Sequence, residues 1–162
     1  MASGEQPATG SGHEPGPLLV TARHSGPTGW LRVRRVINVV NLATPLGLLV
    51  AVAGGGRIER GPHGLLLARD YRARVPAPRA PAVTIGDVVL LRAGDAELAR
   101  RPALLAHEAR HATQYAFWLG PLGFLPAYLL ASAWSWYRTR DFALGNPFEI
   151  RAGLVDGGYR VQ

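Results

Sequence analysis

The stretch His-Glu-Ala-Arg-His-Ala-Thr-Gln-Tyr, residues 107–115, decides what the rest of this chain is expected to build. His107 and His111 are four residues apart, just over one helical turn, so both imidazoles leave one helix face and can hold one metal ion. Glu108 is then placed to take a proton from a metal-activated water. The motif predicts a zinc-dependent hydrolase with one Zn²⁺ and Glu108 as the catalytic residue. The alternative is a surface helix whose two histidines and glutamate face solvent.

The sequence around the motif predicts an α+β domain. Pro102 suits a helical first turn and Gly120-Pro121 is a strong stop signal, so the motif helix is expected at about 102–119. Apolar runs bounded by glycine and proline predict short strands before it. The first element expected is a helix at 29–42, ended by Pro45. An antiparallel or mixed sheet should follow, built from strands at 47–53 and 64–69 and, after the proline-rich loop 75–81, from a hairpin of 82–85 with 88–91. The motif helix and further helices, the last at 146–156, should complete the domain.

Composition limits the class of protein. With 162 residues, 48% of them hydrophobic and 18% charged, the chain suits one globular domain at 28–162 after a disordered tail at 1–27. Cysteine is absent, so a zinc site must use His, Asp or Glu. The net charge of +7 comes from scattered arginines without a recognition motif, which predicts no specific nucleic-acid binding. Residues 1–17 lack the pattern of a signal peptide, which favours a cytoplasmic location.

A zinc site needs a third protein ligand, and Asp141, Glu149 and Asp156 follow the motif. Glu149 is favoured because it can lie on a helix that returns to the motif helix. Asn146 precedes it by three residues, however, which is the spacing of a capping box, so Glu149 could instead hold the start of that helix. Asp156 lies two turns further on, where it could accept a hydrogen bond from a ligand imidazole and set its tautomer.

Residues 112–137 carry no formal charge, which is long enough for a membrane span. Gly120-Pro121, Gly123 and Pro126 interrupt this run, and two core helices joined at the break are therefore favoured. A peripheral protein whose stretch 116–136 and arginines dock on an anionic membrane remains the alternative to an enzyme.

From the motif onward the chain resembles the zincin-type metallopeptidases, and among them the gluzincins, which carry the ligand glutamate on a later helix. The resemblance covers about residues 82–158. It implies His107, His111 and Glu149 as metal ligands and Glu108 as the catalytic glutamate. Glu149 begins Glu-Ile-Arg-Ala, similar to the Glu-x-x-Ala of several gluzincin groups, and residues 107–115 are similar to short bacterial zincin-like domains of unknown function that carry glutamine at the place of Gln114.

The resemblance implies a peptidase acting on a peptide or protein substrate. Tyr128, Tyr159 and Arg151 are candidate donors to the developing oxyanion, and Gln114 and Asp156 are candidates to support the ligands. An extended peptide is expected to pair with the sheet edge, along 82–86 or 88–92. A non-catalytic zincin-like scaffold, whose metal serves only stability, is the other alternative, and the oligomeric state stays open.

Overall fold

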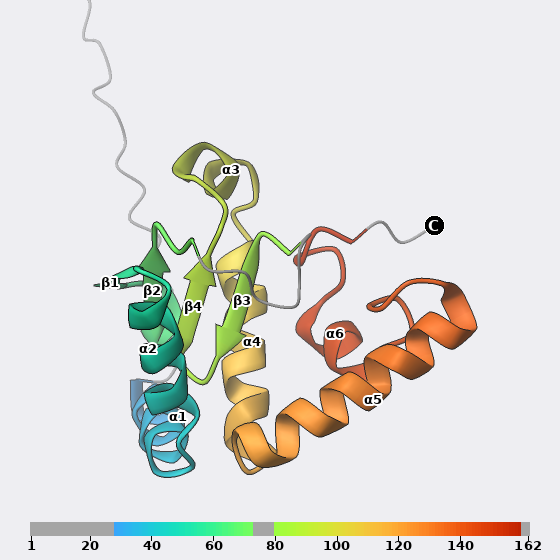
Figure 1. The fold of residues 1–162 in the computed structure, drawn as a ribbon, viewed down its shortest axis with the longest axis horizontal. Helices are drawn as coiled ribbons and strands as arrows, with labels where there is room; N and C mark the ends of the chain where they lie inside the picture. The colour runs from blue at the N-terminus through green and yellow to red at the C-terminus, as the bar shows by residue number, and fades with distance from the viewer. Residues whose placement is uncertain (1–27, 73–79, 160–162) are drawn as a thin grey trace, which may run out of the picture.

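The computed structural model describes residues 28–72 and 80–159 and has the expected mixed α+β fold (Figure 1). The expected tail at 1–27, and all of the proline-rich loop except its last two residues, lie outside the described residues. The helices are α1 (Thr28–Val40), α2 (Ala43–Ala53), α3 (Asp95–Arg100), α4 (Leu104–Phe117), α5 (Pro121–Thr139) and α6 (Pro147–Ala152), with a 3-10 turn η1 (Pro62–Gly64). The strands are β1 (Arg57–Arg60), β2 (Leu66–Arg69), β3 (Ala82–Ile85) and β4 (Val88–Leu91).

The four strands form a mixed sheet in the order β1-β2-β4-β3. The predicted hairpin is confirmed, because β3 and β4 pair antiparallel with Ile85 opposite Val88 across the Gly86-Asp87 turn. Strand β2 pairs antiparallel with β1 and parallel with β4. Strand β4 is therefore internal, and β3 lies at an edge beside the motif helix α4.

The expected strand at 47–53 is wrong, because these residues belong to helix α2. Ala43, Gly47 and Ala51 are buried at intervals of four residues and form a narrow stripe along one side of this helix. A Cβ atom on Gly47 would come within 2.4 Å of the carbonyl oxygen of Ile85, so the stripe of small residues is what lets the helix lie directly on the sheet. A short apolar run does not by itself distinguish a strand from a buried helix.

Other element boundaries also differ from the expectation. Helix α1 ends at Val40, and Pro45 lies in the first turn of α2 instead of ending a helix. The last helix ends at Ala152 rather than 156, because Gly153 takes a φ of 90° that no helix continues through. Strand β1 and helix α3 have no counterpart in the prediction. The motif helix α4 falls within its expected limits.

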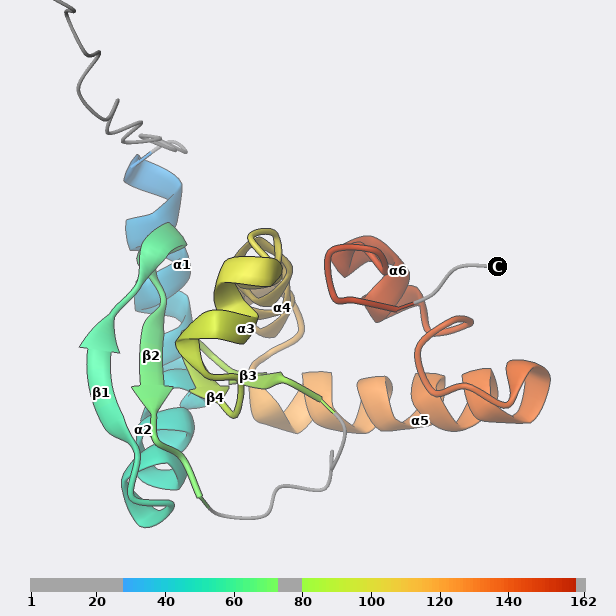
Figure 2. The ribbon, with the colours of Figure 1, turned by 90° about the horizontal axis from the view of Figure 1, so that it is seen from above.

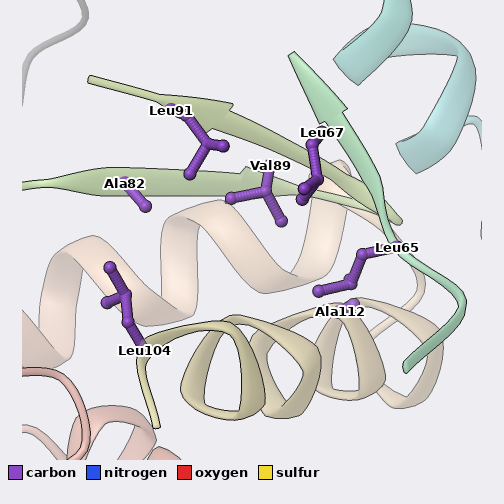
Figure 3. Packing of buried hydrophobic residues seen from close by; sticks show 7 residues of the cluster. All are labelled: Leu65, Leu67, Ala82, Val89, Leu91, Leu104 and Ala112. Atoms are coloured by element: carbon purple, nitrogen blue, oxygen red, sulfur yellow. The ribbon is translucent and has the colours of Figure 1, made fainter. Parts of the chain in front are cut away.

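The core lies on both faces of the sheet, so the domain is layered. Residues of α2 pack on one face with Tyr71, Val88 and Leu90. Helix α4 packs on the other face, where side chains from the strands meet it (Figure 3). Helices α5 and α6 lie beside α4, beyond the edge strand β3 (Figure 2). The cluster between the sheet and α4 comprises Leu65, Leu67, Ala82, Val89, Leu91, Leu104 and Ala112.

Residues 112–137 are divided between two helices, because α4 and α5 meet at a bend of 119°. The break falls at Gly120-Pro121, as the sequence predicts. The expectation that both helices belong to the core holds for α4 and for one side of α5. Helix α5 buries Phe124, Ser132 and Ser135 and packs Tyr128 against the core, whereas its remaining large apolar side chains are exposed.

A buried ion pair joins these layers. The guanidinium of Arg34 on α1 donates to Asp87 Oδ1 at 2.9 Å in the hairpin turn, and both side chains are almost fully buried. Arg34 also donates to the carbonyl oxygens of His63, at 2.8 Å, and Ala109, at 3.4 Å. The Thr44 hydroxyl donates to Asp87 Oδ2 and accepts from the Asp87 backbone N–H. One charged pair thereby holds α1, α2, the hairpin and α4 together.

Replacing Asp87 by alanine leaves the Arg34 charge buried without its partner, so we expect a loss of about 3–5 kcal/mol in the free energy of unfolding. Urea unfolding followed by circular dichroism measures it. The matched control is Asp70→Asn, which removes the charged partner of Arg57 from an exposed ion pair, keeps a residue that tolerates the φ of 58° at position 70, and is expected to cost less than about 1 kcal/mol. Equal losses in the two variants would contradict the central role of the buried pair.

Candidate metal centre

Helices α4 and α6 bring three potential metal ligands together. His107 Nε2 lies 3.3 Å from Glu149 Oε2, and His111 Nε2 lies 3.5 Å from Glu149 Oε1. The two Nε2 atoms are 3.0 Å apart. All three residues are buried, and their ligand atoms lie within 4.8 Å of one another. The sequence prediction of this set is matched by the geometry of the two helices.

The hydrogen bonds of Nδ1 in each histidine determine whether Nε2 is free of a proton and can bind a metal. His107 Nδ1 lies 3.0 Å from the carbonyl oxygens of both Ala152 and Gly153, which only accept, so Nδ1 carries the proton. His111 Nδ1 lies 2.8 Å from Gln114 Oε1, and the other end of that amide donates to the Phe148 carbonyl oxygen. Both imidazoles therefore direct an Nε2 lone pair at Glu149, as metal-ligating histidines do.

Three acceptors that converge in a buried space need a cation. Glu149 Oε2 is buried and has no hydrogen-bond partner among the described residues. Burial alone would raise the pKa of Glu149, but its contacts with His107, His111 and Tyr128 hold that pKa well below the usual range, so the group is a carboxylate. Burial has the opposite effect on His111, whose pKa it lowers. The neighbouring Glu149 and Glu108 more than offset this, so the pKa of His111 is raised. The site is built to stabilise positive charge.

The alternative role of Glu149 as a helix cap is not supported by its contacts. Asn146 caps α6, and its side chain accepts from the Phe148 backbone N–H at 2.9 Å. The Asn146 backbone N–H donates to the Ala143 carbonyl oxygen instead of to Glu149. Asp141, the other candidate ligand, accepts from the backbone N–H groups of Ala143 and Leu144. Of the acids after the motif, Glu149 is the one that joins the histidines.

Glu108 borders the same site and is 4% exposed. Its Oε2 atom accepts a hydrogen bond of 2.6 Å from the Thr84 hydroxyl on the edge strand β3. Thr84 and Glu108 line a cavity of about 150 Å³ together with the three ligands. Sequence reasoning missed Thr84, although it is the polar residue within the apolar strand Ala-Val-Thr-Ile. Its alternation with Ala82 would have placed it on the buried side of that strand.

Two of the predicted oxyanion donors border this cavity and one does not. The Tyr128 hydroxyl donates to Glu149 Oε1, and the Tyr159 ring lies 6.4 Å from the His107 ring. Burial raises the pKa of both phenols, so both remain neutral donors at neutral pH. Arg151 is exposed on α6 and does not line this cavity, so the structure does not bring it to the three ligand groups.

Asp156 does not orient an imidazole, contrary to expectation. It accepts a hydrogen bond of 2.6 Å from Arg110, which also donates to the Ala152 carbonyl oxygen. Because α6 ends at Ala152, Asp156 lies in the following turn and not on the helix face that carries Glu149. The carbonyl groups at the end of α6 take the role predicted for it, and Gln114 performs the supporting role that the sequence predicted.

No family model, curated protein or solved structure matches this chain. The resemblance to zincins therefore rests on the sequence pattern at residues 107–115 and around Glu149. Two helices supply three potential ligand groups, and a strand holds Glu108 beside them.

Replacing Glu149 or His111 by alanine removes one of three ligand groups, so we expect zinc affinity to fall by more than about 100-fold in each variant. This is a larger loss than is expected when a residue that only orients a ligand is removed. Gln114→Ala is expected to fall within that smaller range, about 10–100-fold. Titration with zinc against a competing chelator measures all three. Asp156→Ala is the control that should keep the affinity of the parent protein, and retained affinity in Glu149→Ala would remove the third ligand from this site.

Zinc binding should weaken in acid. The imidazoles bind metal only when Nε2 is unprotonated, and the pKa of His111 is raised, so its proton competes with the metal to a higher pH than usual. At pH values below that pKa, zinc binding must displace one proton from His111. The apparent Kd for zinc is therefore expected to rise about tenfold for each unit by which the pH is lowered. Calorimetry in buffers of different ionisation enthalpy measures both. An affinity that stays constant from acid to neutral pH would exclude a histidine-held metal.

Proposed function

We propose that this chain is a zinc-dependent hydrolase whose substrate is a peptide bond. The observation that carries the proposal is the buried convergence of His107, His111 and Glu149, with Glu149 Oε2 left without a hydrogen-bond partner in the described part of the chain. Two histidines and a carboxylate are a ligand set that zinc prefers.

The number of ligands favours a catalytic site over a metal used only for stability. Structural zinc sites are closed by four protein groups, whereas catalytic ones keep a position open. Three groups converge among the residues that the structure describes, and a cavity adjoins them. Glu108 lies at that cavity without being part of the ligand group, which a purely structural site would not require.

Each side chain then has a separate task. Zinc, when bound, supplies a Lewis acid that lowers the pKa of a water and polarises a carbonyl group. Glu108, held by the Thr84 hydroxyl, accepts a proton from the attacking water and passes it to the leaving amine. Tyr159, a neutral donor at the cavity, supplies a hydrogen bond to the developing oxyanion. Tyr128 orients Glu149.

The position of the sheet edge supports an extended peptide as the substrate. Of the two strands expected to receive it, β4 is internal and β3 is at the edge. Ala82, Val83 and Thr84 of β3 line the cavity, so a chain paired with β3 would pass beside Glu108. Backbone pairing of this kind supplies affinity that is largely independent of side-chain type.

Replacing Glu108 by glutamine keeps the shape of the side chain but removes the proton acceptor, so hydrolysis is expected to fall by about 10²–10⁴-fold. Digestion of a peptide mixture, followed by mass spectrometry, measures the rate on whichever peptides the parent protein cleaves. Zinc content should be unchanged, because Glu108 is not in the ligand group. Arg151→Gln is the control expected to keep full activity. An E108Q variant that cleaves at the parent rate would contradict the mechanism, and a zinc-loaded parent that cleaves no peptide would contradict the substrate.

A further inference from the structure

We propose that this protein docks on anionic lipid bilayers through an apolar face formed by α1 and two helix corners. One corner joins α1 to α2, and the other joins α4 to α5. Both lie at the lower edge of Figure 1. The apolar face consists of Val33, Val36, Val40, Leu42, Phe117, Leu119 and Leu122, all of them exposed.

The two corners are in contact, so the apolar side chains form one surface. Asn41 donates through its side chain to the Tyr115 carbonyl oxygen at 3.2 Å. At the other end of α1, the Trp30 ring stacks on the Phe117 ring with centroids 5.7 Å apart. Helix α1 is therefore tied along its length to the end of α4.

Part of helix α1 shows the reverse of the pattern of a water-facing helix, with polar side chains buried and apolar ones exposed. Arg34 and Asn38 are buried against the protein, whereas Val33, Val36 and Val40 on another side are exposed. At the α4–α5 corner the exposure is larger, with Leu119 at 80% and Leu122 at 89%. Contiguous apolar surface of this kind marks an interaction site.

Two leucines on the face are in a backbone conformation that leucine disfavours. Leu42 has a φ of 65° and Leu119 a φ of 55°, values that glycine or asparagine adopts at lower cost. Both side chains are also exposed, so packing within the chain does not compensate for this cost. Contact of these leucines with an apolar phase outside the protein would account for both observations.

The charges around the face suit an anionic surface. Arg32 and Arg35 are exposed on α1 beside the valines. Residues 28–58 and 109–140, which contain the whole face, include no acidic residue. Helix α3, which carries Asp95 and Glu97, lies at the opposite end of the domain (Figure 1). The face is apolar, has arginines beside it and has no acidic residue in the segments that form it. This combination fits a bilayer with negatively charged headgroups better than it fits a protein partner.

The two corners of the face are bends between pairs of apolar helices. No single helix in the described residues is long and apolar enough to cross a membrane. Two bent pairs reach that length and composition only when taken together, Gly29–Val40 with Ala43–Ala53 at 73° and Leu104–Phe117 with Pro121–Thr139 at 119°. Their two bends are the corners that form the apolar face.

The test is co-sedimentation of the full chain with two kinds of vesicle, phosphatidylcholine alone and phosphatidylcholine mixed with phosphatidylglycerol, at low and high salt. We expect binding to the mixed vesicles that weakens but persists at high salt, because salt screens the arginines and not the apolar contact. The double variant L42N/L119N should bind at least about tenfold more weakly. Its thermal midpoint should be unchanged or higher, because asparagine tolerates positive φ.

Matched controls separate the face from general effects. The variant V52N/V155N removes two exposed valines outside the face and should bind like the parent chain. Removing Arg32 and Arg35 together, as glutamine, should weaken binding about fivefold for each arginine, whereas R60Q/R100Q should change it less.

Three results would overturn the proposal. The first is no binding to mixed vesicles at low salt. The second is equal weakening by L42N/L119N and V52N/V155N, which would indicate non-specific adsorption. The third is a dimer in sedimentation velocity that L42N/L119N dissociates, which would make the face a contact between two copies of the chain.

Discussion

The buried guanidinium of Arg34 is the constraint on which the arrangement of this domain depends. A charge taken out of water requires partners on several sides, and Arg34 finds them in Asp87 of the hairpin turn and in the carbonyl groups of His63 and Ala109. These partners come from three elements that are far apart in the sequence. Satisfying one side chain therefore fixes where α4 lies against the sheet, and with it the position of the histidine motif.

Helix α4 contributes to two separate regions of the molecule, the candidate metal centre and the proposed membrane-docking face. Residues 104–111 of this helix carry the histidines, which are oriented by a glutamine on the same helix and by carbonyl groups at the end of α6. Its last residue, Phe117, belongs to the proposed membrane-docking face. Helix α5 links both regions, because Tyr128 contacts Glu149 while Leu122 is exposed at the corner. Docking at that face would hold the proposed catalytic cavity at one orientation to the bilayer.

The prediction was wrong where local pattern and tertiary packing favour different outcomes. The run 47–53 is apolar enough for a strand, but the four-residue spacing of Ala43, Gly47 and Ala51 lets it pack on the sheet as a helix. Helix α6 was predicted too long, because the positive φ of Gly153 was not foreseen, and Asp156 was misplaced as a result. Most of the large apolar residues on α5 were assigned to a core that only one side of the helix, with Phe124, enters.

By itself the sequence determined the motif helix, the β-hairpin and the three candidate ligands, because helical periodicity, turn residues and ligand chemistry are local properties. It left Glu149 between two roles, since a spacing of three residues from Asn146 suits a cap as well as a later ligand. Only the tertiary structure showed that its carboxylate lies beside both imidazoles, while Asn146 caps α6. It also decided that Thr84 holds Glu108, because contacts between a strand and a helix 24 residues later leave no spacing rule in the sequence.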